Sequence, residues 1–182
     1  MTITFLGTGT SQGVPVIACD CDVCKSVDFR DKRTRSSVHI KANDLSLIID
    51  TGPDFRSQVL RERIKWVDAI IFTHQHKDHT AGMDDIRSFN FHQKMDMPVY
   101  ARKEVITQLK KEFSYIFQEK KYPGIPRIKT FEIENKPFKI NKCEILPINV
   151  LHHQLPVFGF RIGNFTYITD ANLISDDEME KI

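Results

Sequence analysis

Four side chains of types that commonly bind metal ions lie within six positions of the sequence: His74, His76, Asp78 and His79. They follow an apolar run over residues 67–72 that is typical of a buried strand. Because strand side chains repeat every two residues, His74 and His76 would point to the same side. A turn into a helix over residues 83–91 would bring Asp78 and His79 back towards them. Two-metal hydrolytic sites hold their ions about 3.5–4 Å apart, so this short segment predicts a site for two divalent ions.

A histidine at a strand end also has simpler roles. A single one is more often a surface group, or a core residue whose ring nitrogens are satisfied by neighbours. Four such groups together have few uses in packing, whereas imidazole and carboxylate are common ligands of zinc and also suit manganese and iron. The metal interpretation is therefore preferred, with Zn²⁺ or Mn²⁺ as the ion and iron as a further choice.

The His-x-His-x-Asp-His pattern resembles the hallmark of the metallo-β-lactamase-fold hydrolases. Three further segments carry this resemblance: the glycine-rich residues 5–15, the cysteine cluster in 19–24, and residues 47–52. Together they are similar to the phosphodiesterase branch, and within it to the phosphoribosyl 1,2-cyclic phosphate phosphodiesterases. The similarity covers nearly the whole chain and is loose over residues 84–140.

The resemblance implies which side chains bind each ion. His74 and His76 would bind one ion together with a third histidine, either His152 or His153. His153 is preferred because its distance to the following Phe-Gly pair matches the family. Asp78 and His79 would bind the second ion.

Two further aspartates follow strand-like runs and receive roles from the same resemblance. Asp170 would bridge both ions, and Asp50 would hold a ligand histidine by a hydrogen bond. On residue type alone, Asp170 is equally a turn residue or a helix cap. A plain turn over residues 50–53 explains Asp50 almost as well.

The chemistry expected of this site comes from the metals. Two divalent ions make a bridging water available as hydroxide near neutral pH and neutralise charge that develops on phosphoryl oxygens. Asp78 and Asp170 would be the catalytic carboxylates. The chain shows neither the Gly-x-Ser-x-Gly motif of serine hydrolases nor a Walker-type phosphate loop. We therefore predict a metal-dependent phosphodiesterase for a small phosphate diester, cyclic diesters included.

Three cysteines form a second candidate metal site: Cys19, Cys21 and Cys24. Their Cys-x-Cys-x-x-Cys spacing suits thiolate binding of a structural zinc ion, and the resemblance implies a fourth ligand from beyond these residues. Three reduced surface cysteines are the alternative. Cys143 lies in a strand-like run and is expected in the core. Free cysteines, with no apparent signal peptide or apolar span, predict a cytoplasmic protein.

The elements expected to position these residues alternate between strands and helices. Strands are expected over residues 3–6, 45–49, 67–72, 143–150, 158–162 and 165–168, and helices over 55–65 and 103–117. With 41% hydrophobic and 27% charged residues, the composition is that of an ordinary globular domain. We predict one α/β domain over residues 1–182, arranged as the family's four-layer αββα sandwich.

The end of the sequence departs from the family pattern. Residues 172–182 read as a helix that begins after Ser175, and family members usually continue for another sixty or so residues. We therefore expect a C-terminally truncated chain that lacks part of its second half. The unfinished sheet would leave an edge that invites homodimerisation.

Charge distribution bears on the substrate. Residues 101–142 contain eleven Lys or Arg and five Glu, which either steers a phosphorylated substrate to the site or is a solvated helix face. A tRNA 3′-processing endonuclease is the second enzymatic hypothesis, with residues 115–127 as a short flap for nucleic acid. β-Lactamase or thioesterase activity is a weaker one. A metal-stabilised binding protein without turnover is the alternative of another class. No membrane partner is expected.

Overall fold

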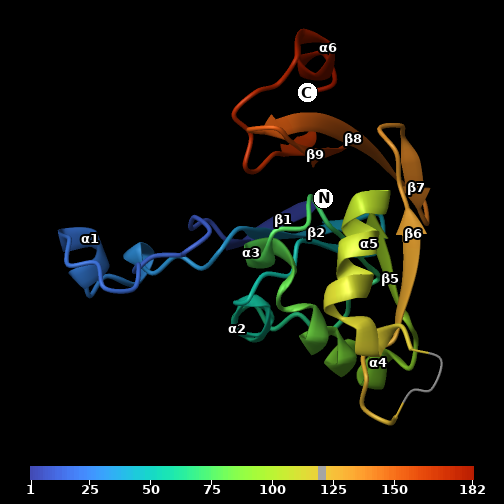
Figure 1. Ribbon diagram of the computed structural model, residues 1–182, viewed down its shortest axis with the longest axis horizontal. Helices are drawn as coiled ribbons and strands as arrows, with labels where there is room; N and C mark the ends of the chain where they lie inside the picture. Colours follow the sequence, from blue (N-terminus) through green and yellow to red (C-terminus); the bar gives the residue numbers. More distant parts are fainter. Residues whose placement is uncertain (119–121) are drawn as a thin grey trace.

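The computed structural model describes residues 1–118 and 122–182, and its larger sheet has six strands in sequential order (Figure 1). These strands are β1 (Thr2–Gly7), β2 (Ser37–Ala42), β3 (Leu45–Ile49), β4 (Ala69–Ile71), β5 (Met97–Ala101) and β6 (Ile128–Glu132). The pairs from β1 to β3 are antiparallel, and those from β3 to β6 are parallel. Parallel strands end at a common edge, so the loops after β3, β4 and β5 meet there.

Both faces of the six-stranded sheet are buried. On β3, Ile48 joins a core cluster with the helices, whereas Leu47 and Ile49 join a cluster with the second sheet. This division follows from the two-residue repeat of strand side chains. The helices over the first face are α2 (Phe55–Arg61), α4 (Arg87–Gln93) and α5 (Lys103–Glu112).

The second sheet has four antiparallel strands in the order β10-β9-β8-β7. They are β7 (Phe138–Ile140), β8 (Cys143–His152), β9 (Leu155–Ile162) and β10 (Phe165–Tyr167). In Figure 1 this sheet lies above the first, and the short helix α6 (Asp176–Met179) lies beyond it. The layers are therefore helices, sheet, sheet and a short helix, which confirms the αββα arrangement expected from the sequence.

The expected strands are all present, although four others were missed: β2, β5, β6 and β7. β5 contains Pro98, which argues against a central strand in a sequence pattern. The expected helix over 103–117 is divided: α5 ends at Glu112, and a 3₁₀ turn (η3, Ser114–Ile116) follows. Residues 119–121 of the predicted flap lie outside the described residues. No helix in the described ranges is long and apolar enough to span a membrane.

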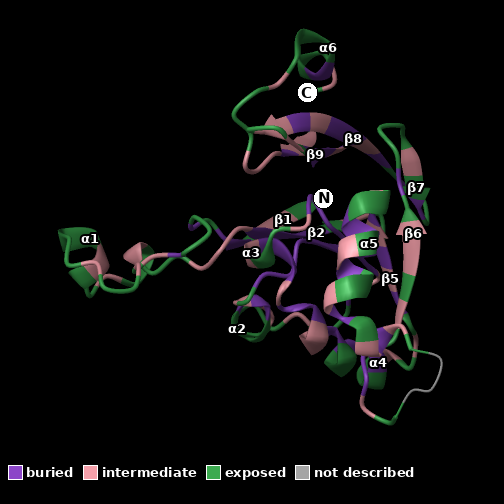
Figure 2. Ribbon diagram, viewed as in Figure 1, coloured by how far each residue is buried: buried purple, intermediate pink, exposed green. Residues whose placement is uncertain are grey.

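One segment projects away from the two sheets. Between β1 and β2 the chain forms an arm that contains the short helix α1 (Asp22–Lys25) and the 3₁₀ turn η1 (Phe29–Asp31), seen at the left of Figure 1. Figure 2 shows that most of its outer part is exposed, including Val27 and Phe29, which are 100% and 81% exposed. The arm therefore has little core of its own.

Candidate metal centre

The His-x-His-x-Asp-His segment lies at the shared edge of the parallel strands. It leaves β4 after Ile71 and enters the one-turn helix α3 (Lys77–Thr80). The preceding turn at Gly52 packs directly against it, because a Cβ atom on Gly52 would lie 2.1 Å from the carbonyl oxygen of Asp78. Backbone hydrogen bonds from Thr51 to His79 and from Gly82 to Thr51 join the two segments. The absence of a side chain at Gly52 therefore allows the turn that bears Asp50 to reach the histidines.

The structure brings the predicted ligands from separate segments into one cluster. The ring of His74 lies 4.2 Å from that of His79 and 4.6 Å from that of His76, between centroids. Ligand atoms of His74, His79 and Asp170 all lie within 4.8 Å of one another. Asp78 Oδ2 lies 3.2 Å from His79 Nε2. Residues far apart in the sequence thus present nitrogen and oxygen atoms to the same small volume.

Asp50 and Thr73 determine how His74 is presented. The carboxylate of Asp50 accepts hydrogen bonds from the backbone N–H of Thr73 and from its hydroxyl, each at 2.8 Å. Having donated its proton to Asp50, Thr73 Oγ1 can only accept from His74 Nδ1, which lies 2.9 Å away. The proton of neutral His74 is therefore on Nδ1, and the lone pair is on Nε2.

His74 Nε2 is the decisive atom for a metal. It is buried and has no hydrogen-bond partner among the described residues. Burial, and then the neighbouring His79, lower the pKa of His74 to about 4, so its ring is neutral at physiological pH. A buried, unprotonated nitrogen without a partner is unfavourable unless a cation binds it. The residues present therefore fit a divalent ion.

His79 is held from both sides. Its Nδ1 donates to Asp50 Oδ2 at 2.7 Å, while Nε2 lies 3.0 Å from Asp170 Oδ2. Burial opposes a charge on the ring, but Asp50 and the hydrogen bonds to Asp170, Asp50 and Asp78 outweigh it and raise the pKa of His79 to about 12. The hydrogen bond from His79 also lowers the pKa of Asp170. Without a metal, a proton on His79 offsets part of the negative charge of Asp50, Asp78 and Asp170.

Asp170 is brought to the cluster by the segment that follows β10. It has a positive φ of 54°, an unusual conformation that occurs often at functional sites. Thr169 Oγ1 donates to its Oδ2 at 2.7 Å. Beyond it, Asn172 N donates to the carbonyl of Leu151 at 2.9 Å, so the end of β8 and Asp170 are held side by side.

The geometry favours His152 as the third histidine of the first ion. The family resemblance favours His153 instead. The ring of His152 lies 5.5 Å from that of His76 and 6.2 Å from that of His74. His153 is exposed, has a φ of 55° and makes its ring contact with His152 alone among the described aromatic pairs. The two-residue turn between β8 and β9 begins at His153, whose ring lies 5.2 Å from that of His152.

The cysteine cluster is a separate site on the arm. The Sγ atoms of Cys19, Cys21 and Cys24 lie within 4.8 Å of one another. Hydrogen bonds from the Cys24 backbone and from the Cys19 and Cys24 side chains lower the pKa of Cys21, which favours the thiolate form that binds metals. Cys143 lies in the core at 3% exposure, as expected.

Part of the positive charge in residues 101–142 is paired with acids. Among the described residues, three of the eleven basic side chains form ion pairs: Arg102–Glu104, Arg127–Asp96 and Lys136–Glu134. At these three positions the charge run is a solvated surface.

The sequence matches the beta-lactamase superfamily domain over residues 46–182. The chain belongs to the beta-lactamase superfamily. Within it, a solved structure of a diphosphatase from the PhnP family is 39% identical, with a TM-score of 0.90, and the match covers 98% of this chain and 68% of that one. This relative supports the phosphodiesterase branch of the metallo-β-lactamase fold.

Two further proteins that are similar to this chain are named for other activities. An octanoyltransferase of Porphyromonas gingivalis is 38% identical over 182 residues, which are 99% of this chain and 37% of that protein. Its name therefore refers to a longer protein, and most of that protein lies outside the region matched by this chain. Ribonuclease Z of Staphylococcus saprophyticus is 27% identical over 170 residues, covering 89% of this chain and 49% of the enzyme.

Sequence reasoning missed one residue of the centre, Thr73. Its position directly before His74 was visible, but a threonine at a strand end has many uses. Only the tertiary contact with Asp50 shows that its hydroxyl controls the neighbouring ring.

Proposed function

We propose that the protein is a metal-dependent phosphodiesterase that hydrolyses a small phosphate diester, with cyclic diesters as the preferred substrates. The observation that carries this proposal is the buried Nε2 of His74, which has no hydrogen-bond partner in the described part of the chain although His79 and Asp170 lie beside the ring. The similarity to a PhnP-family diphosphatase supports phosphate as the group attacked.

The proposed ligand set contains six residues. His74, His76 and His152 would hold one ion, Asp78 and His79 the other, and Asp170 would lie between them. Two divalent ions, zinc or manganese, would supply the Lewis acidity that activates water and neutralises charge on phosphoryl oxygens. A further zinc ion bound by Cys19, Cys21 and Cys24 would have a structural role.

The residues around the ligands orient them. Asp50 and Thr73 hold the Nε2 atoms of His74 and His79 towards the cluster. The hydroxyl of Thr73 is fully buried and bonded to Asp50, so it does not serve as a nucleophile. Water is therefore the expected attacking group.

The test is metal content by elemental analysis together with turnover of bis-p-nitrophenyl phosphate. We expect about three metals per chain, two for the centre and one for the cysteines, and activity that falls about 100-fold or more in Asp78→Ala. The control Asp96→Ala removes an exposed carboxylate paired with Arg127 and should leave both quantities unchanged. Metal binding without turnover of any diester would instead support a non-catalytic binding protein.

A second candidate is a tRNA 3′-processing endonuclease, favoured by the similarity to ribonuclease Z. Precursor tRNA and a small cyclic diester can be compared as substrates under the same conditions. Cleavage of precursor tRNA with a higher kcat/KM than the small diester would reverse our ranking.

A further inference from the structure

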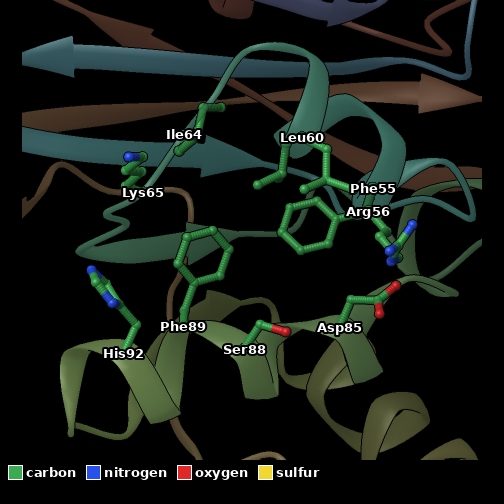
Figure 3. A pocket seen from close by; sticks show the side chains of 10 residues that line it. Phe55, Arg56, Leu60, Ile64, Lys65, Asp85, Ser88, Phe89 and His92 are labelled. Carbon is green, nitrogen blue, oxygen red and sulfur yellow. The ribbon is translucent and has the colours of Figure 1, made fainter.

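A second concave site lies between α2 and α4, on the helical face of the larger sheet (Figure 3). It encloses about 460 Å³, within the range of small-molecule sites. Its lining residues are Phe55, Arg56, Val59, Leu60, Ile64, Lys65, Asp85, Ser88, Phe89 and His92. None of them belongs to the proposed metal centre.

The floor of this hollow is aromatic. Phe55 and Phe89 are 1% and 6% exposed, and their ring centroids are 6.3 Å apart at an angle of 47°. Leu60 at the rim is 59% exposed, which is high for a leucine beside two buried rings. The two rings thus form a buried floor, and the apolar surface that a ligand could remove from water is mainly that of Leu60.

Charge is distributed unevenly along the hollow. Figure 3 shows Arg56 and Asp85 at one end, and Lys65 and His92 at the other. The acid offsets the arginine at the first end, whereas the second end has two basic groups and no acid among the lining residues. Within the described part of the chain, Lys65 takes part in none of the ion pairs. The Lys65 end is thus complementary to an anion.

We propose that this hollow binds a small organic carboxylate with an apolar body. The carboxylate would lie at Lys65 and His92, and the apolar body would cover Leu60 and the half-buried Val59 and Ile64. Both features are needed, because one exposed ion pair contributes little by itself and the apolar surface alone does not select an anion.

The test uses 4-phenylbutyrate as the probe, with calorimetry for affinity and ¹H–¹⁵N NMR for location. We expect a dissociation constant below about 1 mM, with shifted amides at Val59 and Phe89. The uncharged 4-phenylbutanol should bind about tenfold more weakly. Acetate, which lacks the apolar body, should leave these amides unshifted.

Variants separate this site from the metal centre. Lys65→Gln should weaken binding of 4-phenylbutyrate about two- to fivefold while leaving binding of 4-phenylbutanol unaffected. Lys139→Gln, an exposed lysine on β7, is the matched control and should change neither. Equal binding of acid and alcohol, or an unchanged affinity in Lys65→Gln, would overturn the proposal. Amide shifts confined to His76 and Asp78 would also overturn the proposal, because they would place the carboxylate of the probe at the metal centre.

Discussion

The metal centre and the cysteine arm are assembled in opposite ways. The side chains proposed to bind the ions of the centre come from segments around residues 74–79, 152 and 170, whereas the arm places three thiols together within six residues. His74 and His79 are nearly fully buried, but Cys21 is exposed. A site made by tertiary contacts depends on the core, and a site made by local spacing does not.

The hydrogen bonds around the two sites also differ in the sequence distance that they span. Asp50 is fully buried and accepts bonds from Thr73 and His79, which belong to another part of the chain. Around the cysteines, the hydrogen bonds join residues close in sequence, such as that from Val16 N to Cys24 Sγ. Disrupting the centre should therefore destabilise the whole domain, and disrupting the arm should act locally.

The largest expected effect is that of Asp50→Ala. It leaves the donors of Thr73 and His79 buried without their acceptor, which should lower the free energy of unfolding by about 3–5 kcal/mol. Metal affinity at the centre should fall about 10- to 100-fold. Urea denaturation and chelator competition measure the two quantities.

The control for this change is Asp68→Asn. Asp68 also accepts bonds from a backbone N–H and from a side chain, those of Ser46 and Trp66, but it lies outside the centre. It should reduce stability without changing metal affinity. A normal metal affinity in Asp50→Ala would contradict the dependence of the centre on the core.

The free energy of unfolding of the metal-free protein should depend on pH, whereas that of the zinc-loaded protein should not. In the metal-free protein the pKa of His79 is raised to about 12, against 6.5 in the unfolded chain. This contribution is fully present below pH 6.5 and is lost as the pH rises towards 12. Between pH 7 and 9 the free energy of unfolding of the metal-free protein should fall by about 2–3 kcal/mol. That of the zinc-loaded protein should not, because the metal replaces the proton.

Urea denaturation at several pH values measures this slope. His79→Asn in the metal-free state should remove it, whereas Cys21→Ser should retain it, since the arm does not contact the buried carboxylates. Equal slopes with and without zinc would show that His79 does not exchange a proton for a metal.

A smaller effect is expected of Thr73→Val. The substitution keeps the shape of the side chain but removes the hydroxyl that fixes the tautomer of His74, so metal affinity should fall about tenfold. Thr73→Ser keeps the hydroxyl and should restore most of it. The ¹⁵N shifts of the His74 ring report the tautomer directly, and an unchanged tautomer in the valine variant would refute this role.

The smallest effect on the domain is expected of Cys21→Ser. It should reduce the metal content by one ion per chain, and the free energy of unfolding of the two sheets should change by less than about 0.5 kcal/mol. Elemental analysis and urea denaturation give both numbers. A large loss of stability would show that the arm is part of the cooperative core and would remove the contrast between the two sites.

The sequence by itself determined the features that depend on short spacing. The two-residue repeat of strands such as β3 and the close series from His74 to His79 were visible because strand geometry and ligand chemistry act locally. The cysteine cluster was predicted for the same reason. β5 was missed because its proline conflicts with the local signal, although pairing with two neighbours stabilises it.

Only the tertiary structure decided which distant groups meet. It placed His152 instead of His153 beside His76, because β8 ends at His152 and the following turn holds His153 in a left-handed backbone conformation. It also joined Asp50 to Thr73 and His79 across a contact that Gly52 makes possible. Such contacts depend on how buried layers pack, and packing between segments far apart in a chain leaves no periodic signal in the sequence.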